Sequence, residues 1–302
     1  MKLFHNSSSR SARRAFTIIE IAICLGIIGF ALVAIIAVLP RGLDVQKRNR
    51  EETIIGQDAD VWMSALRSGA KGYDDLTNYM VCVTNFWTTY DTQQKVVKSG
   101  FDYYTPTDSI VTSIAGRSPG DFPLTNGEHI VGLLSMPKRI PLPGYEPFPI
   151  DAPYQSNYVV AYVRAFSGPM VDKTPQTNAF IRADAFTYRM IVENFPYTPV
   201  DTNSFCVDCP AAAGLSSDDL AARTNLSRAI FMLQTNANDL RLRFRWPVLP
   251  NGQIPNYGFA TFRSLVDGPL FYTNSSQHGS YPDQPLFFVD PSTSIQVPNG
   301  IK

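Results

Sequence analysis

A long apolar segment lies near the start of the chain, over residues 16–39, and it contains a single charged side chain, that of Glu20. As a helix that rises about 1.5 Å per residue, this segment is about 36 Å long, enough to cross a hydrocarbon core of about 30 Å. A core helix of a soluble protein would carry a polar face, which this pattern does not offer. The pattern predicts a transmembrane helix over residues 16–39, with Pro40 kinking or interrupting it at the membrane exit.

The residues on either side of this segment bear on two questions, whether it is removed as a signal peptide and how it is oriented in a membrane. A secretory signal peptide has an apolar region of about 7–15 residues before a small-residue cleavage site, whereas this run is longer and is followed by AVLPRGLD. We therefore expect the apolar segment to stay in the mature protein. Basic residues lie in equal number on the two sides of the segment, so the positive-inside rule leaves its orientation open.

Helical periodicity continues after the apolar segment, although the sequence becomes polar. An apolar stripe steps by three or four residues through Ile55, Ala59, Trp62 and Leu66. This spacing predicts an amphipathic helix extension over residues 40–72, packed on a sheet, with Asp58, Asp60 and Arg67 elsewhere on its surface. Gly69 falls where the periodic pattern stops.

Residues 73–302 predict a β-rich globular head. The first part, to residue 150, is aromatic and rich in proline, and it favours short strands and loops; the prolines of 141–153 exclude a helix or a central strand there. Residues 158–166 and 179–192 predict the two strands of a wide hairpin. A second hairpin is expected from 229–233 to 240–246, and a turn at LPNGQ follows. Shorter strands are expected at 257–263, 269–273 and 285–289.

The strand LRLRFRW alternates strictly. Leu240, Leu242, Phe244 and Trp246 face one side, and Arg241, Arg243 and Arg245 face the other. Three arginines on one face could bind an anionic partner or a glycan. Alternatively they form a solvated face that discourages aggregation between strands.

Composition narrows the classes of function. The formal net charge is zero, which argues against general nucleic-acid binding. Residues 1–15 carry only basic charges, so the rest of the chain is mildly acidic. We expect no nucleic-acid partner.

The reactive side chains do not assemble into a recognisable catalytic motif. Cys206 and Cys209 are expected to form a disulfide that staples a loop, with a redox pair, half a zinc site or a bond from Cys82 as the alternatives. His129 and His278 are isolated, and the sequence contains no G-x-S-x-G, H-E-x-x-H or P-loop motif. We therefore expect no enzymatic activity, no cofactor and no metal site. Asp218-Asp219 and the TNANDL stretch contain calcium-type ligands without the spacing of an EF-hand.

Glu20 is the most informative residue of the apolar segment. A charged side chain in a membrane-spanning helix is costly and persists when it has a partner. Two candidates for a partner are the α-amino group that a cut between Ala15 and Phe16 would create, and a basic leader residue such as Arg14. Alternatively the carboxylate reaches the membrane surface by snorkelling.

The stretch RRAFTIIE, followed by an apolar helix, resembles the prepilin cleavage and methylation motif of type IV pilins and type II secretion pseudopilins. The resemblance implies a leader over 1–15, cleavage by a prepilin peptidase between Ala15 and Phe16, methylation of the new amine, and an assembly role for Glu20. Members of the family usually carry Gly at the position of Ala15. The stretch DLRLRFRWPVLPNG also resembles the C-terminal end of prepilin-like proteins of the Verru_Chthon cassette group.

Small residues in the apolar segment fit an assembly role. Ala22, Gly26 and Gly29 recur at a spacing that lets neighbouring helices approach closely. Taken with the resemblance, the expected fold is α+β and pilin-like. A long N-terminal helix, half transmembrane and half amphipathic, would pack on an antiparallel sheet.

The expected function is that of a minor pilin or pseudopilin. Such a subunit sits in the inner membrane by a single pass, with its head in the periplasm or outside the cell, and its partners are membrane lipid, the peptidase and other pilin-like subunits. One alternative is a single-pass anchored binding protein that never assembles. Another is an anchored hydrolase acting on a polymer.

Overall fold

The computed structural model describes residues 17–69, 74–106, 122–124, 126–142, 153–166, 186–197, 214–249, 251–255, 258–274 and 285–290. The chain divides into two compact units, residues 1–51 and 52–302. The described part of the first unit is the N-terminal portion of helix α1 (Ile18–Ser68), and the rest of α1 belongs to the second unit together with the strands.

Helix α1 contains the predicted apolar segment from Ile18 onward. Over its most apolar 18 residues the mean hydropathy is 3.0, and among the described residues it is the one helix long and apolar enough to cross a membrane. Of the two effects predicted for Pro40, a kink or an interruption, the interruption is wrong, because the helix runs through this residue. Proline lacks one N–H and so removes one hydrogen bond of the ladder, and the helix continues on both sides of that single gap. The helix ends at Ser68, followed by Gly69 at φ +67°, a left-handed conformation that favours glycine.

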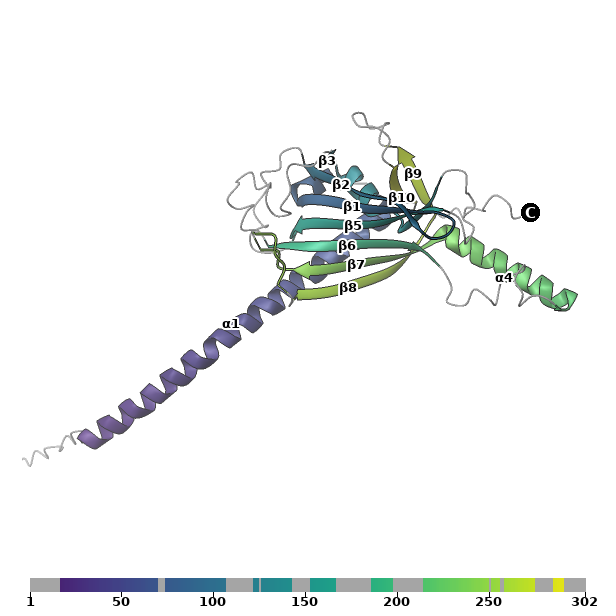
Figure 1. Ribbon diagram of the computed structural model, residues 1–302. Helices are drawn as coiled ribbons and strands as arrows, with labels where there is room; N and C mark the ends of the chain where they lie inside the picture. The colour runs from purple at the N-terminus through teal and green to yellow at the C-terminus, as the bar shows by residue number, and fades with distance from the viewer. Residues whose placement is uncertain are drawn as a thin grey trace, which may run out of the picture. The chain divides into compact units, whose positions relative to one another are not determined.

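The second unit is built on a mostly antiparallel sheet (Figure 1). In the part of the chain that the structure describes, eight strands form this sheet in the order β3-β2-β1-β5-β6-β7-β8, with β4 paired to β5. Neighbours are antiparallel except β2 and β3, which are parallel. The strands are β1 (Met80–Tyr90), β2 (Val96–Pro106), β3 (Phe122–Leu124), β4 (Arg139–Pro141), β5 (Tyr154–Arg164), β6 (Thr187–Pro196), β7 (Ala237–Trp246) and β8 (Gly258–Asp267). The α+β class is thus confirmed.

Smaller elements complete the described fold. Strands β9 (Leu270–Asn274) and β10 (Pro285–Val289) form a separate antiparallel pair, and η1 (Asp74–Asn78) is a short 3₁₀ helix. The predicted hairpin of residues 158–166 and 179–192 is confirmed by the antiparallel pairing of β5 with β6. The turn predicted at LPNGQ is also present, where the Leu249 N–H donates to the Gln253 carbonyl and the Gly252 N–H donates to the Leu249 carbonyl.

The core lies between the second-unit part of α1 and one face of the sheet. The predicted stripe is confirmed, because Ile55, Ala59, Trp62 and Leu66 are all buried in this core. Side chains from the central strands meet them there, including Tyr188, Leu242 and Phe244. Burial of this continuous apolar surface is the dominant stabilising term of such a layer.

Asp58 does not lie on the helix surface, contrary to the prediction, and its side chain is fully buried. Its Oδ2 atom accepts a hydrogen bond of 3.0 Å from the Phe166 N–H, and its carboxylate is also hydrogen-bonded to Tyr188. A buried carboxylate is tolerated when hydrogen bonds compensate its lost hydration. The sequence does carry a sign of this burial, because Asp58 precedes Trp62 by four residues and therefore lies on the same face of the helix.

Two segments predicted as strands or loops are helices. Residues 229–233 belong to α4 (Ser217–Asn236), which runs directly into β7, so the expected second hairpin is wrong. The Ser216 side chain caps α4 by accepting from the Asp219 N–H, and acidic residues in the first turn favour the helix. Helix α2 (Gly127–Leu134) begins in the same way, with Asn126 accepting a hydrogen bond of 2.8 Å from the His129 N–H.

Candidate functional site

The apolar part of α1 is the first candidate site. Every side chain from Ile18 to Leu39 is exposed within its own unit. Contiguous apolar surface of this extent marks a membrane or protein interaction site. The predicted processing residues Ala15 and Phe16 lie outside the described residues.

Glu20 stands in the first turn of this apolar helix. Its backbone N–H donates to the Thr17 carbonyl at 3.1 Å and to the Thr17 Oγ1 at 3.4 Å, so Thr17 caps the helix beside it. The ion pairs found among the described residues do not include its carboxylate. The acid is therefore presented to the surroundings of the helix.

The predicted small residues form an open face of the same helix. A Cβ atom placed on Gly26 or Gly29 would meet nothing within 4 Å. At about 100° per residue, Ala22, Gly26 and Gly29 project to one side of α1, and Glu20 projects to the opposite side. Close packing against one neighbour and charge pairing with another are therefore geometrically compatible.

An arginine-rich face of the sheet is the second candidate site. Burial along β7 alternates as predicted, with the apolar residues in the core and Arg241, Arg243 and Arg245 on the other face. The neighbouring strands add two more, because Arg189 of β6 lies opposite Arg245 and Arg263 of β8 lies opposite Arg241. Sequence reasoning missed these two, since only the register between strands brings them together.

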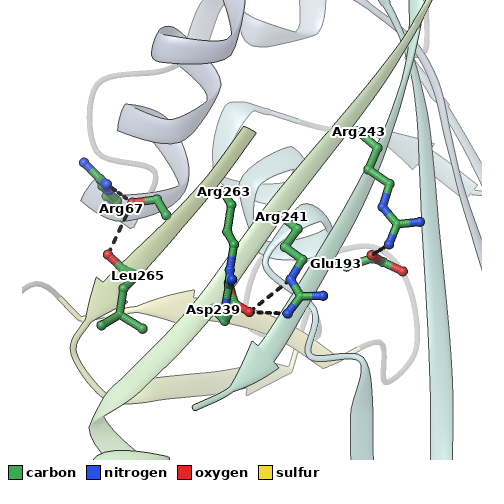
Figure 2. A network of polar contacts seen from close by, with 8 residues as sticks. Arg67, Glu193, Asp239, Arg241, Arg243, Arg263 and Leu265 are labelled. Carbon is green, nitrogen blue, oxygen red and sulfur yellow. Dashed lines mark hydrogen bonds and ion pairs between the residues drawn. The ribbon is translucent and has the colours of Figure 1, made fainter. Parts of the chain in front are cut away.

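Two buried carboxylates neutralise part of this charge, as Figure 2 shows. Asp239 accepts from the Arg241 Nε at 3.0 Å and from the Arg263 Nε at 2.7 Å. Glu193 forms ion pairs with Arg243 at 2.8 Å and with Lys138 at 3.8 Å. Burial acts to raise the pKa of Asp239, but the hydrogen bonds from Arg263 and Arg241 outweigh it and hold the pKa below its usual value. Asp239 is therefore ionised at neutral pH.

The arginines line a groove of about 670 Å³ on this face. Its walls are Tyr158, Arg189, Ile191, Arg241, Arg243, Arg245, Phe259, Thr261 and Arg263. The Arg245 guanidinium lies over the Phe259 ring at 5.5 Å, and the Lys138 ammonium lies over the Tyr158 ring at 4.8 Å. The Nε of Arg189 is buried and has no hydrogen-bond partner in the part of the chain that the structure describes. Such a surface attracts anions.

The remaining candidate residues do not gather into a site. Cys206, Cys209 and His278 lie outside the described residues, and Cys82 is buried in β1. His129 sits in the first turn of α2. Asp218 and Asp219 lie in the first turn of α4. Within the described ranges, no cluster of three or more His, Cys, Asp or Glu side chains could hold a metal ion.

No protein-family model, curated protein or solved structure matches this chain.

Proposed function

We propose that this protein is a pilin-like structural subunit, a minor pilin or pseudopilin that a prepilin peptidase processes and that assembles into a type IV pilus or type II secretion pseudopilus. The observation that carries the proposal is the apolar part of α1, exposed throughout its length, with one acid, Glu20, in its first turn. Upstream of this acid the chain reads RRAF, so Glu20 would be the fifth residue of a mature chain that begins at Phe16 after removal of a basic leader.

The cost of an isolated charge explains why Glu20 would act in assembly. A carboxylate at the centre of a bilayer costs about 2.5–3.5 kcal/mol on insertion scales, and less near the interface. A pair with an opposite charge offsets this cost. The α-amino group of Phe16, on a neighbouring subunit, is such a charge, and it exists only after cleavage behind Ala15. Processing would therefore precede assembly.

The two faces of α1 support a bundle of such helices. Glu20 on one side would fix the register against one neighbour, while Ala22, Gly26 and Gly29 on the other side would admit another helix at close range. A plain membrane anchor requires neither feature. The opposed faces thus favour a multi-subunit assembly over a solitary helix.

The sheet supports the layout of a pilin-like head. The second-unit part of α1 covers one face of a mostly antiparallel sheet. This is the arrangement expected when the N-terminal part of a helix assembles with other subunits and its C-terminal part packs in the core of the globular head. In this proposal the helix crosses the inner membrane once and the head lies in the periplasm or outside the cell. The size of the head favours a minor or tip position over that of a repeating major subunit.

Intact-protein mass spectrometry of the chain from cells with an active prepilin peptidase tests the proposal. We expect a mature chain that begins with N-methyl-Phe16, and Ala15→Gly should raise the processed fraction. Recovery of the intact leader from Met1 would overturn the proposal.

Assembly is tested separately with Glu20→Ala. We expect this variant to insert into membranes normally and to be lost from sheared filaments, because its charge partner is gone. Glu52→Ala, which removes an exposed acid from the second-unit part of the same helix, serves as the matched control and should assemble like the parent. Normal assembly of Glu20→Ala would remove the registration role and favour an anchored binding protein.

The hydrolase alternative receives little support from the two carboxylates of the sheet. A general acid needs a raised pKa, whereas the pKa of Asp239 is lowered and both Asp239 and Glu193 are ion-paired. Two ion-paired carboxylates are suited to neutralising the neighbouring arginines and not to donating a proton to a substrate.

A further inference from the structure

The arginine groove has a surplus of positive charge on a small area of sheet. Five arginines line it, and Lys138 lies beside it over the Tyr158 ring. Among the described residues, ion pairs bring two carboxylates to these cations: Asp239 pairs with Arg241 and Arg263, and Glu193 pairs with Arg243 and Lys138. Arginines directly opposite each other on neighbouring strands repel. The sheet therefore maintains a local field that an anion entering the groove would relieve.

Arg189 marks the position where such an anion would bind. In the equivalent cross-strand pair of Arg241 with Arg263, the carboxylate of Asp239 sits between the two guanidinium groups and accepts from both. Arg189 lies opposite Arg245 in the same manner, but its buried Nε has no hydrogen-bond partner among the described residues. Because Arg189 lines the groove, a ligand carboxylate there would take the place beside Arg189 and Arg245 that Asp239 takes beside Arg241 and Arg263.

An aromatic row continues the outer face of the sheet away from the arginines. Phe101, Phe86 and Tyr158 lie opposite one another on β2, β1 and β5, with ring centroids 6.1 Å and 6.4 Å apart. All three are substantially exposed, at 51%, 38% and 36%. Tyr158 also lines the groove, so the aromatic row and the arginines form one continuous surface.

We propose that this surface binds an acidic polysaccharide of the uronic-acid type, with a sugar carboxylate held by Arg189. The planar guanidinium fork matches a carboxylate in a bidentate manner, and this sheet already holds two carboxylates of its own among its arginines. A groove of about 670 Å³ is within the range of small-ligand sites, about 300–1,000 Å³, and so suits a short stretch of a sugar chain. The exposed ring faces offer apolar contact to the sugar rings beside it.

Single-stranded nucleic acid fits the same surface less well. Its binding relies on aromatic platforms on which successive bases stack, whereas the Phe86 ring is tilted by 48° and 53° to its two neighbours. Nucleic-acid-binding domains are also strongly basic as a rule, and this chain has a pI near 6.8. The groove lies wholly within the head, so the glycan proposal does not depend on processing or assembly of the N-terminal helix.

Binding of polygalacturonate to the full chain in detergent, measured by biolayer interferometry at fixed ionic strength, tests the proposal. We expect saturable binding that salt weakens, and little binding of fully methyl-esterified polygalacturonate, which has the same sugar backbone without the charge. Arg189→Gln should weaken binding about tenfold or more, as expected for the loss of a charge-assisted hydrogen bond. Arg228→Gln, an identical change on the exposed surface of α4, should bind like the parent.

The outcomes separate cleanly. Equal binding of the esterified polymer, or unchanged affinity of Arg189→Gln, would overturn the proposal. So would tighter binding of an oligothymidylate than of polygalacturonate at the same ionic strength, which would assign the groove to nucleic acid. If Arg189→Gln does not fold, as judged by near-UV circular dichroism, Arg245→Gln takes its place with the same expected loss.

Discussion

Asp58 provides the sharpest test of how α1 is fixed to the sheet. Its carboxylate accepts from the Phe166 N–H at 3.0 Å and is hydrogen-bonded to the Tyr188 hydroxyl, which accepts in turn from the Trp62 Nε1–H at 3.0 Å. Burial, and then the charge of Asp58, raise the pKa of Tyr188 well above its usual value, so the hydroxyl stays protonated and donates to Asp58. Replacing Asp58 with alanine removes the acceptor for both donors.

The magnitude follows from how well each donor can find a new partner. Each hydrogen bond to a charged group is worth about 1.5–3 kcal/mol, and an orphaned buried donor costs about 1–3 kcal/mol. The Phe166 N–H is only part-buried, so water can replace the carboxylate there, whereas the Tyr188 hydroxyl is fully buried. Removing the charge also removes its own desolvation cost. Together these terms predict a loss of about 2–4 kcal/mol for Asp58→Ala, or about 5–15 °C in Tm for a unit of this size.

Thermal unfolding of the detergent-solubilised protein, followed by near-UV circular dichroism, measures this loss. Asp58→Asn keeps one acceptor oxygen and should cost less than the alanine variant. Asp60→Ala, an exposed acid on the same helix, should stay within about 0.5 kcal/mol of the parent. If Asp58→Ala and Asp60→Ala unfold at the same temperature, the buried network does not contribute as argued.

Two further predictions concern the sheet. A Cβ on Gly258 would clash with the backbone oxygen of Trp246 on β7, so Gly258→Ala should lower the free energy of unfolding by about 1–3 kcal/mol or more. On α1, a Cβ on Gly56 would meet nothing within 4 Å, so Gly56→Ala should raise the free energy of unfolding by up to about 1 kcal/mol. Changes of the same sign in both variants would refute this prediction. Because Asp239 has a lowered pKa in the folded state, its contribution to stability is present above about pH 4 and is lost as pH falls through the folded pKa. Tm measured from pH 7 to pH 2 should therefore decline less steeply on the acid side for Asp239→Asn than for the parent, and parallel curves would refute this.

Much of the fold was predictable from local patterns, because the periodicity within one segment identifies the buried face of that helix or strand. The stripe from Ile55 to Leu66 and the alternation of Leu240 to Trp246 each reveal a buried face directly. The apolar run at 229–233 is different, since a short run of this kind suits a strand and a helix equally. The Ser216 cap, more than ten residues upstream, resolves that ambiguity in favour of α4.

Long-range pairing is what the sequence could not supply. Strand β1 pairs with β5 across more than sixty residues of chain, and no local pattern indicates this. The same holds for the arginine groove, because Arg189 and Arg263 reach it only through the register of β6 and β8 with β7. Three of its five arginines were visible in one strand, and the other two needed the sheet.

Two acids of α1, Asp58 and Glu20, differ in whether the described part of the chain supplies partners for their carboxylates. Asp58 is buried in the core, and its partners are supplied within the chain by Phe166 and Tyr188. Glu20 stands in the exposed apolar part of the helix, which is long and apolar enough to cross a membrane, and the ion pairs among the described residues do not include its carboxylate. A carboxylate taken out of water must be compensated in either setting. The described part of the chain supplies partners for Asp58 and none of the ion pairs there includes Glu20. In the proposed assembly, the N-terminus of a second subunit would supply the compensation for Glu20.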